Sequence, residues 1–410
     1  MNTPMPAFTS PVFTVFNHGT CASRDGQGEI VAEFGRLAAG VEYRDFLICD
    51  GPGSSPTTAP IPGQFNPFTR DKQAKSLFGR KEMGHTHHNW KVTGVMTGAG
   101  WDDNVMHAVA TIAELNPAPK TVNMLGWSRG AVTCTKLAYK LREIFPEIAV
   151  NIFAVDPVAG IGNKGDEDAS TIRGNVKNYL SVLSMHETRG FFKPQDSKRV
   201  TFTNAQTNAI YVPFPGNHSG QVNLDKSVKK ELGESAQMTW FLAWKFLDHF
   251  GTRFTAPPSP DYNGLEQCNL YARMKSKMPG YKKTSPGIAQ AVLGARKTRD
   301  FLNHRIDQYV KFSDFFINEH HRRIFKRTLP YLYMWVFENQ GIDTKAVVQD
   351  YKKAEFYTAL KQSLIDIGFQ PTQLGGLPTV LLPIRGGGQQ AVDISTRQLT
   401  ASMSSMGLYV

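Results

Sequence analysis

The segment between residues 121 and 145 constrains the fold of this chain more than any other part of the sequence. An apolar run predicts a strand, the turn Gly126-Trp127-Ser128-Arg129-Gly130 follows, and a helical pattern over Ala131–Phe145 comes next. Glycines two residues on either side of the serine allow a sharp strand-to-helix turn that presents the hydroxyl at the end of the strand. An N-cap role would explain the serine but not both glycines. The pattern therefore predicts that Ser128 is a nucleophile.

The first 250 residues alternate apolar β-like runs with helical patterns. This alternation is typical of a mainly parallel sheet with helices on both faces. The predicted strands are Val12–Phe16, Phe46–Cys49, Thr121–Leu125, Val150–Val155, Tyr179–Met185 and Ala209–Val212. Further helices are predicted over Asp103–Leu115 and from about Ser235 to Phe250. Residues 53–100, rich in Ser, Pro, Thr and Gly, interrupt the pattern, and we expect a lid or substrate loop there.

A nucleophilic serine needs a histidine base, and the histidine needs a carboxylate that fixes its tautomer. Where such a turn joins a strand to a helix, the chain order is serine, acid, histidine. His218 follows the last predicted strand in a Pro-Gly-Asn loop and is the expected base, with His186 in reserve. Asp156 ends the strand NIFAV and is the expected acid, and Glu187, one strand later, is the alternative acid.

A transition-state oxyanion needs two hydrogen-bond donors. The backbone N–H of Arg129, next after Ser128, is the expected first donor. Gly19 and Thr20, in the turn after the first predicted strand, are the expected second source, although a plain tight turn would also explain Gly19.

No metal or cofactor is expected. His85, His87 and His88 lie close together but lack matching carboxylates, so an exposed loop cluster is the preferred interpretation. The four cysteines lack metal-ligand spacing and are interpreted as reduced, small buried residues of a cytosolic product.

The formal net charge of +11 is concentrated in one segment, because residues 271–330 hold 14 Lys and Arg against 4 Asp and Glu. Such a block favours an anionic partner, a membrane surface or a nucleic acid, whereas a solvated helical face is the alternative. Residues 251–368 are predicted to form a basic helical cap or membrane-docking region, and residues 369–410 a Gly/Pro-broken tail.

No apolar run is long enough to span a membrane, and the start of the chain lacks the pattern of a secretory signal. We therefore expect a cytoplasmic protein in the producing cell, which would need a signal-independent route to act outside it.

Four segments in this order resemble the α/β-hydrolase family typified by the phospholipase effectors of type VI secretion systems. They are His18-Gly19-Thr20, Gly126-Trp127-Ser128-Arg129-Gly130-Ala131, Asp156-Pro157-Val158 and Phe214-Pro215-Gly216-Asn217-His218-Ser219. The resemblance covers about residues 12–250, and His186-Glu187 departs from the family's Asp-Glu pair. It implies an α/β-hydrolase fold, a phospholipase A-type bacterial toxin, and lipid or phospholipid as substrate. An anionic membrane surface, the secretion apparatus and an immunity protein are the implied partners, and nucleic acid is not favoured.

Two other functions remain open from the sequence. The first is a soluble serine esterase that acts on a small, non-lipid ester. The second is an inactive hydrolase fold used as a binding protein, against which the intact order Ser128, Asp156, His218 argues.

Overall fold

The computed structural model describes residues 11–52, 101–160, 166–187, 193–224 and 233–256, with scattered positions from 270 to 321 and two short strands near the end of the chain. The chain divides into two compact units, residues 1–260 with 278–306, and residues 261–277 with 307–410. The predicted lid over 53–100 and nearly all of the predicted cap over 251–368 lie outside the described residues. The boundaries assigned to these regions stay predictions.

The first unit is built on a sheet of six strands in the order β2-β1-β3-β4-β6-β8, and all neighbouring strands are parallel. The strands are β1 (Val12–Asn17), β2 (Phe46–Cys49), β3 (Thr121–Trp127), β4 (Ala149–Val155), β6 (Val176–Ser184) and β8 (Asn208–Phe214). A minor sheet pairs β5 (Thr171–Ile172) with β7 (Thr201–Phe202). The six-stranded sheet confirms the predicted fold class.

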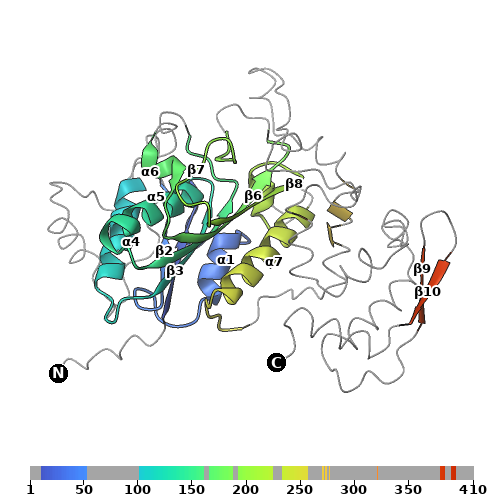
Figure 1. Ribbon diagram of the computed structural model, residues 1–410, viewed down its shortest axis with the longest axis horizontal. Helices are drawn as coiled ribbons and strands as arrows, with labels where there is room; N and C mark the ends of the chain where they lie inside the picture. The colour runs from blue at the N-terminus through green and yellow to red at the C-terminus, as the bar shows by residue number, and fades with distance from the viewer. Residues whose placement is uncertain are drawn as a thin grey trace. The chain divides into compact units, whose positions relative to one another are not determined.

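Helices cover both faces of this sheet. The longer ones are α1 (Ile30–Leu37), α4 (Trp101–Ala113), α5 (Arg129–Ile144) and α7 (Glu234–His249), and the short ones are α6 (Glu167–Ser170) and the 3₁₀ helix η1 (Ser219–Gln221). In the sheet, β2 lies on one side of β1, whereas β3 and then β4 follow on the other side. The connection from β1 to β2 therefore runs across the sheet in the opposite direction to the connection from β3 to β4. Right-handed crossovers therefore place α1 on one face and α5 on the other. In Figure 1, α1 lies beside α7, and α4 lies beside α5.

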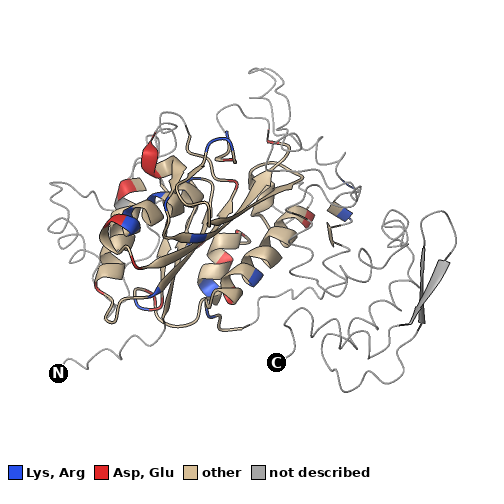
Figure 2. Cartoon of the chain, viewed as in Figure 1, with Lys and Arg blue, Asp and Glu red and all other residues tan. Residues whose placement is uncertain are grey.

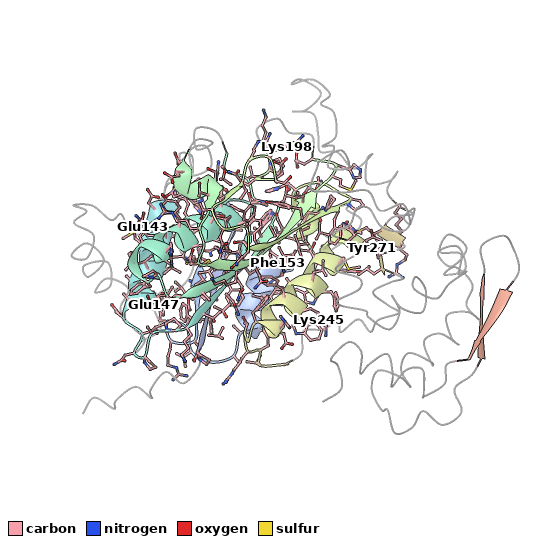
Figure 3. All side chains as sticks on the ribbon, viewed as in Figure 1. Glu143, Glu147, Phe153, Lys198, Lys245 and Tyr271 are labelled. Atoms are coloured by element: carbon pink, nitrogen blue, oxygen red, sulfur yellow. The ribbon has the colours of Figure 1, made fainter. Side chains whose placement is uncertain are left out.

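The core consists of apolar side chains from the strands and from the facing sides of the helices. Phe13, Phe16 and Phe153 are fully buried, and Phe153 lies near the middle of the sheet (Figure 3). Because both faces of a parallel sheet are covered, its strands are apolar almost throughout. The described acidic and basic residues accordingly lie mostly on helices and loops (Figure 2). On the face of α1 and α7, the rings of Phe34 and Trp240 stack with their centroids 4.2 Å apart.

A row of asparagines crosses the sheet at one level. In the strand register Asn123 of β3 pairs with Asn151 of β4, which pairs with Asn178 of β6, which pairs with Asn208 of β8. Each side-chain amide donates to the next one along the row: Asn208 to Asn178 over 3.2 Å, Asn178 to Asn151 over 2.8 Å, and Asn151 to Asn123 over 3.0 Å. Asn123 in turn donates to the Phe250 carbonyl at the end of α7. The row satisfies buried amides and fixes one register, because a one-residue slip would break every bond in it.

The second unit is described at few positions. Its clearest element is the antiparallel pair β9 (Thr379–Pro383) and β10 (Gln389–Asp393). These strands lie in the region predicted as a Gly/Pro-broken tail, and the sequence analysis did not predict them. No helix in the described part of the chain is long and apolar enough to cross a membrane.

Candidate active site

The carboxyl ends of the parallel strands meet at one edge of the sheet. Trp127 at the end of β3 pairs with Val155 at the end of β4, and Val155 pairs with Val182 of β6. Ser128 and Asp156 therefore directly follow two neighbouring strands at the same edge of the sheet. The direction in which successive strands are added to the sheet reverses between β1 and β3, and ligands of open α/β sheets bind at such a switch point.

Ser128 occupies a sharp turn between β3 and α5. Its backbone has φ 57° and ψ −121°, a conformation that costs a non-glycine residue free energy and that marks functional sites. The Ser128 N–H donates to the Val155 carbonyl over 2.9 Å, which anchors the turn to β4. Within the described residues its side chain makes no capping hydrogen bond to α5, so the hydroxyl is not used as an N-cap. The structure therefore gives the Ser128 side chain no N-cap role.

The two elbow glycines are needed for close approach of the backbone. A Cβ at Gly126 would lie 2.5 Å from the carbonyl oxygen of Gly130. A Cβ at Gly130 would lie 2.1 Å from the carbonyl oxygen of Asn17, at the end of β1. Real Cβ contacts are longer than this, so a side chain at either position would push α5 away from β3 or β1. The glycines hold the start of α5 against the switch point.

Asp156 and His218 are in direct contact. Asp156 Oδ2 lies 2.6 Å from His218 Nδ1, and both side chains are buried. The other carboxylate oxygen of Asp156 accepts the Ser184 N–H over 3.0 Å, so the carboxylate is held from two sides. Asp156 has a left-handed φ of 40°, which turns its side chain across the edge of the sheet. In this arrangement a carboxylate can fix the tautomer and the orientation of a histidine.

The two reserve candidates instead support the loop that carries His218. Glu187 Oε2 accepts the backbone N–H of His218 over 3.1 Å. His186 Nδ1 accepts the N–H of Gly216 over 2.9 Å, and the His186 N–H donates to the Gly216 carbonyl over 2.9 Å. Ser184 Oγ donates to the Asn217 carbonyl over 3.2 Å. The end of β6 therefore fixes the loop after β8.

Trp127 is a site residue that the sequence analysis did not single out. Its ring lies 5.3 Å from that of His218 between centroids, at an interplanar angle of 33°. A Cβ at Gly19 would lie 2.6 Å from the Trp127 ring, so a glycine at this position leaves space for the ring. The indole thus lies against both the turn after β1 and the histidine. The sequence feature that could have identified Trp127 is its position between Gly126 and Ser128. From there an aromatic side chain can contact both the turn after β1 and the histidine.

The turn after β1 is fixed by hydrogen bonds on both sides. The His18 N–H donates to the Cys49 carbonyl over 2.9 Å, and the Cys21 N–H donates to the Pro52 carbonyl over 3.0 Å. His18 Nδ1 lies 3.0 Å from a carboxylate oxygen of Glu29. Among the described residues, the amides of Gly19 and Thr20 between these anchors remain the candidate donors for an oxyanion.

Three cysteines lie in the described segments, and two of them are buried. Burial raises the pKa of Cys134 to about 12, so that thiol is neutral at pH 7, and it accepts a hydrogen bond from Asn17. Cys49 is also buried, and its pKa is raised for the same reason, whereas Cys21 is exposed. No group of three potential ligands in the described segments is arranged to hold a metal ion. His85, His87 and His88 lie outside these segments.

The parallel sheet, the elbow after β3 and the acid–histidine contact together make an α/β-hydrolase fold. Residues 274–361 match a domain of unknown function (DUF5621), which is less than half of the chain and does not include the elbow. No curated protein matches the chain.

Three solved structures show a similarity at low sequence identity. An uncharacterized protein from Pseudomonas aeruginosa is 16% identical with a TM-score of 0.36, over 67% of this chain and 56% of that one. The Tle1 effector bound to the VgrG spike of the type 6 secretion system is 13% identical with a TM-score of 0.29, over 52% and 51%. A structure of the metagenome-derived lipolytic enzymes LipS and LipT is 14% identical with a TM-score of 0.30, over 54% and 91%. The chain spans only about half the length of the first two.

Proposed function

We propose that this protein is a serine hydrolase that cleaves carboxylic esters of lipids, with Ser128 as nucleophile, His218 as base and Asp156 as the orienting acid. The observation that carries the proposal is the 2.6 Å contact between Asp156 and His218 at the strand edge where the Ser128 elbow lies. The Trp127 ring joins the elbow to the histidine. A nucleophile, a base and an orienting carboxylate are the parts of an acyl-enzyme mechanism.

In this mechanism the Ser128 oxygen attacks the ester carbonyl, and its proton passes to His218 Nε2. The N–H of Arg129 and an amide of the Gly19–Thr20 turn donate to the oxyanion. His218 then gives the proton to the alcohol that leaves, and an acyl group remains on Ser128. In the second half, water gives a proton to His218 and attacks the acyl carbonyl. The bond between the acyl carbon and the Ser128 oxygen then breaks, His218 returns the proton to that oxygen, and the carboxylic acid is released. Asp156 stays ionised and stabilises the imidazolium in both halves.

The lipid substrate is supported by the sequence resemblance, since the elbow and the Phe214-Pro215-Gly216-Asn217-His218-Ser219 segment agree with the phospholipase effectors in content and in order. We extend the proposal to a phospholipase A-type bacterial toxin on the same ground. The secretion apparatus and an immunity protein are then its protein partners. The basic segment 271–330 would dock on anionic lipid.

A substrate panel tests this function. The purified full chain would be given vesicles of phosphatidylcholine, phosphatidylethanolamine and phosphatidylglycerol, and in parallel p-nitrophenyl butyrate. We expect release of fatty acid and lysophospholipid, and none with Ser128→Ala. Turnover of the butyrate ester alone would favour the soluble esterase. No turnover of any ester, together with no labelling of Ser128 by a fluorophosphonate, would favour a binding protein.

A further inference from the structure

The side chain of Arg129 is buried inside the candidate site although arginine is among the residues least often buried. The whole residue is 7% exposed. Its Nη1 donates to the Thr20 hydroxyl over 2.9 Å, and its guanidinium carbon lies 5.8 Å from the ring centroid of Trp101. Burial lowers the pKa of this guanidinium. Removing a charged group from water costs free energy, so a role that compensates for the cost is expected.

Gly160 makes room for the guanidinium. It has a left-handed φ of +80°, and a Cβ at this position would lie 2.5 Å from Arg129 Nη2. Gly160 ends the described part of the loop that begins with Asp156 after β4. The Arg129 side chain thus lies among the turn after β1, the start of α4 and the loop after β4, and these segments are far apart in the sequence.

The two halves of the expected oxyanion hole belong to separate segments. One donor is the Arg129 N–H at the start of α5, and the other is an amide of the Gly19–Thr20 turn. An oxyanion is stabilised only when its donors lie about 2.7–3.1 Å from it, so the separation of the two segments matters. The bond from Arg129 Nη1 to Thr20 Oγ1 spans them.

We propose that the Arg129 side chain is a positioning residue that holds the two halves of the oxyanion hole at the correct separation through Thr20. The inference rests on the proposed serine-hydrolase function and adds a role to it for one side chain and one hydroxyl. Arg129 then acts twice, with its backbone N–H as donor and its guanidinium as the brace. A bond that fixes the separation of the two donors preorganises the hole.

A double-mutant cycle on p-nitrophenyl butyrate tests the brace. Thr20→Val has nearly the shape of threonine but lacks the acceptor oxygen, and Arg129→Gln lacks the guanidinium. Each single change is expected to lower kcat by about 10- to 100-fold with KM within about twofold, because a misplaced donor weakens only transition-state binding. The double variant is expected to be no slower than the slower single variant, since both changes break the same bond.

Two matched variants separate this role from a general structural one. Thr20→Ser keeps the hydroxyl and is expected to restore kcat to within about threefold of the wild type. Thr111→Val removes a buried hydroxyl that donates to the His107 carbonyl of its own helix, and we expect it to leave kcat unchanged. Losses of kcat in Thr111→Val as large as in Thr20→Val would overturn the proposal.

The rival is that the guanidinium binds an anionic group of the substrate. Arg129→Gln would then raise KM for the p-nitrophenyl monoester of succinic acid and spare the neutral butyrate ester, which would overturn the brace. Additive losses in the double variant would overturn it as well. If the wild type neither turns over p-nitrophenyl butyrate nor reacts with a fluorophosphonate at Ser128, the proposed function and the brace both fail. If the wild type turns over the ester but the losses of kcat in the two single variants add up in the double variant, only the proposed role of the Arg129 side chain fails.

Discussion

His218 Nδ1 lies 2.6 Å from Asp156 Oδ2, although 62 residues separate the two in the chain. The parallel sheet explains the contact, because Asp156 directly follows β4 and the loop after β8 lies at the same edge of the sheet. Ser184 joins the two parts, since its N–H donates to Asp156 and its hydroxyl donates to the loop carbonyl of Asn217.

Asp156→Asn is expected to lower kcat by about a thousandfold or more, because asparagine favours the wrong tautomer of His218. Glu187→Gln is expected to cost little, since the Gln oxygen can still accept the His218 N–H. Glu187→Ala is expected to cost more than the Gln variant, because it removes that acceptor and loosens the loop. Steady-state kinetics on p-nitrophenyl butyrate measures all three. If Glu187→Gln proved slower than Asp156→Asn, Glu187 after β6 would be the orienting acid instead of Asp156.

Ser128→Ala is expected to abolish ester hydrolysis, a loss of several orders of magnitude, while the chain stays folded. Alanine is smaller than serine, and the hydroxyl does not cap α5. Activity, circular dichroism and fluorophosphonate labelling would be compared with those of the wild type. Residual activity above a few per cent of the wild type, or equal labelling of both proteins, would exclude Ser128 as the nucleophile.

Most of the sheet could be predicted from the sequence because buried parallel strands are short apolar runs. The six predicted strands occur in the structure, with ends that differ by a few residues; β6, for example, begins at Val176 rather than Tyr179. Helix α1 was not predicted, since its eight residues are interrupted by Gly35 and its N-cap is Glu29, outside the usual capping types. The carboxylate of Glu29 nevertheless accepts the N–H groups of Val31 and Ala32.

The candidate site could be predicted only in part, for a physical reason. Residues that end strands are placed by topology, so Ser128, Asp156 and the His218 loop could be expected at one edge. Supporting contacts depend on where side chains point, which spacing does not reveal. The hydrogen bond from Ser184 to Asp156 and the contact of the Trp127 ring with His218 are such supporting contacts.

The asparagine row gives a prediction for stability. Asn151→Ala removes a donor to Asn123 and an acceptor from Asn178, and its own side chain is buried. Leaving two partners unsatisfied is expected to lower the free energy of unfolding by about 2 to 4 kcal/mol. Asn208→Ala at the exposed end of the row is expected to cost less than about 1 kcal/mol, because water replaces its bond. Urea denaturation followed by tryptophan fluorescence compares them, and equal losses would contradict a buried network.

The last prediction concerns the basic segment 271–330 and the aromatic residues that follow it, Tyr331, Tyr333, Trp335 and Phe337. Each basic residue near an anionic bilayer contributes about 1 kcal/mol, and salt screens the attraction over a Debye length. We therefore expect binding to vesicles with phosphatidylglycerol, weaker at raised salt. Charge reversal at Arg322, Arg323, Lys326 and Arg327 is expected to lower activity on these vesicles but not on p-nitrophenyl butyrate.

Vesicle sedimentation and fatty-acid release would be measured side by side over a salt series, with vesicles of phosphatidylcholine alone as the uncharged control. The opposing view is a folded cap whose charges only face water. That cap would make activity on anionic vesicles independent of salt, and charge reversal would then lower activity on both substrates equally or on neither. Loss on the anionic vesicles alone distinguishes docking from a cap, because the soluble ester reaches Ser128 without the bilayer.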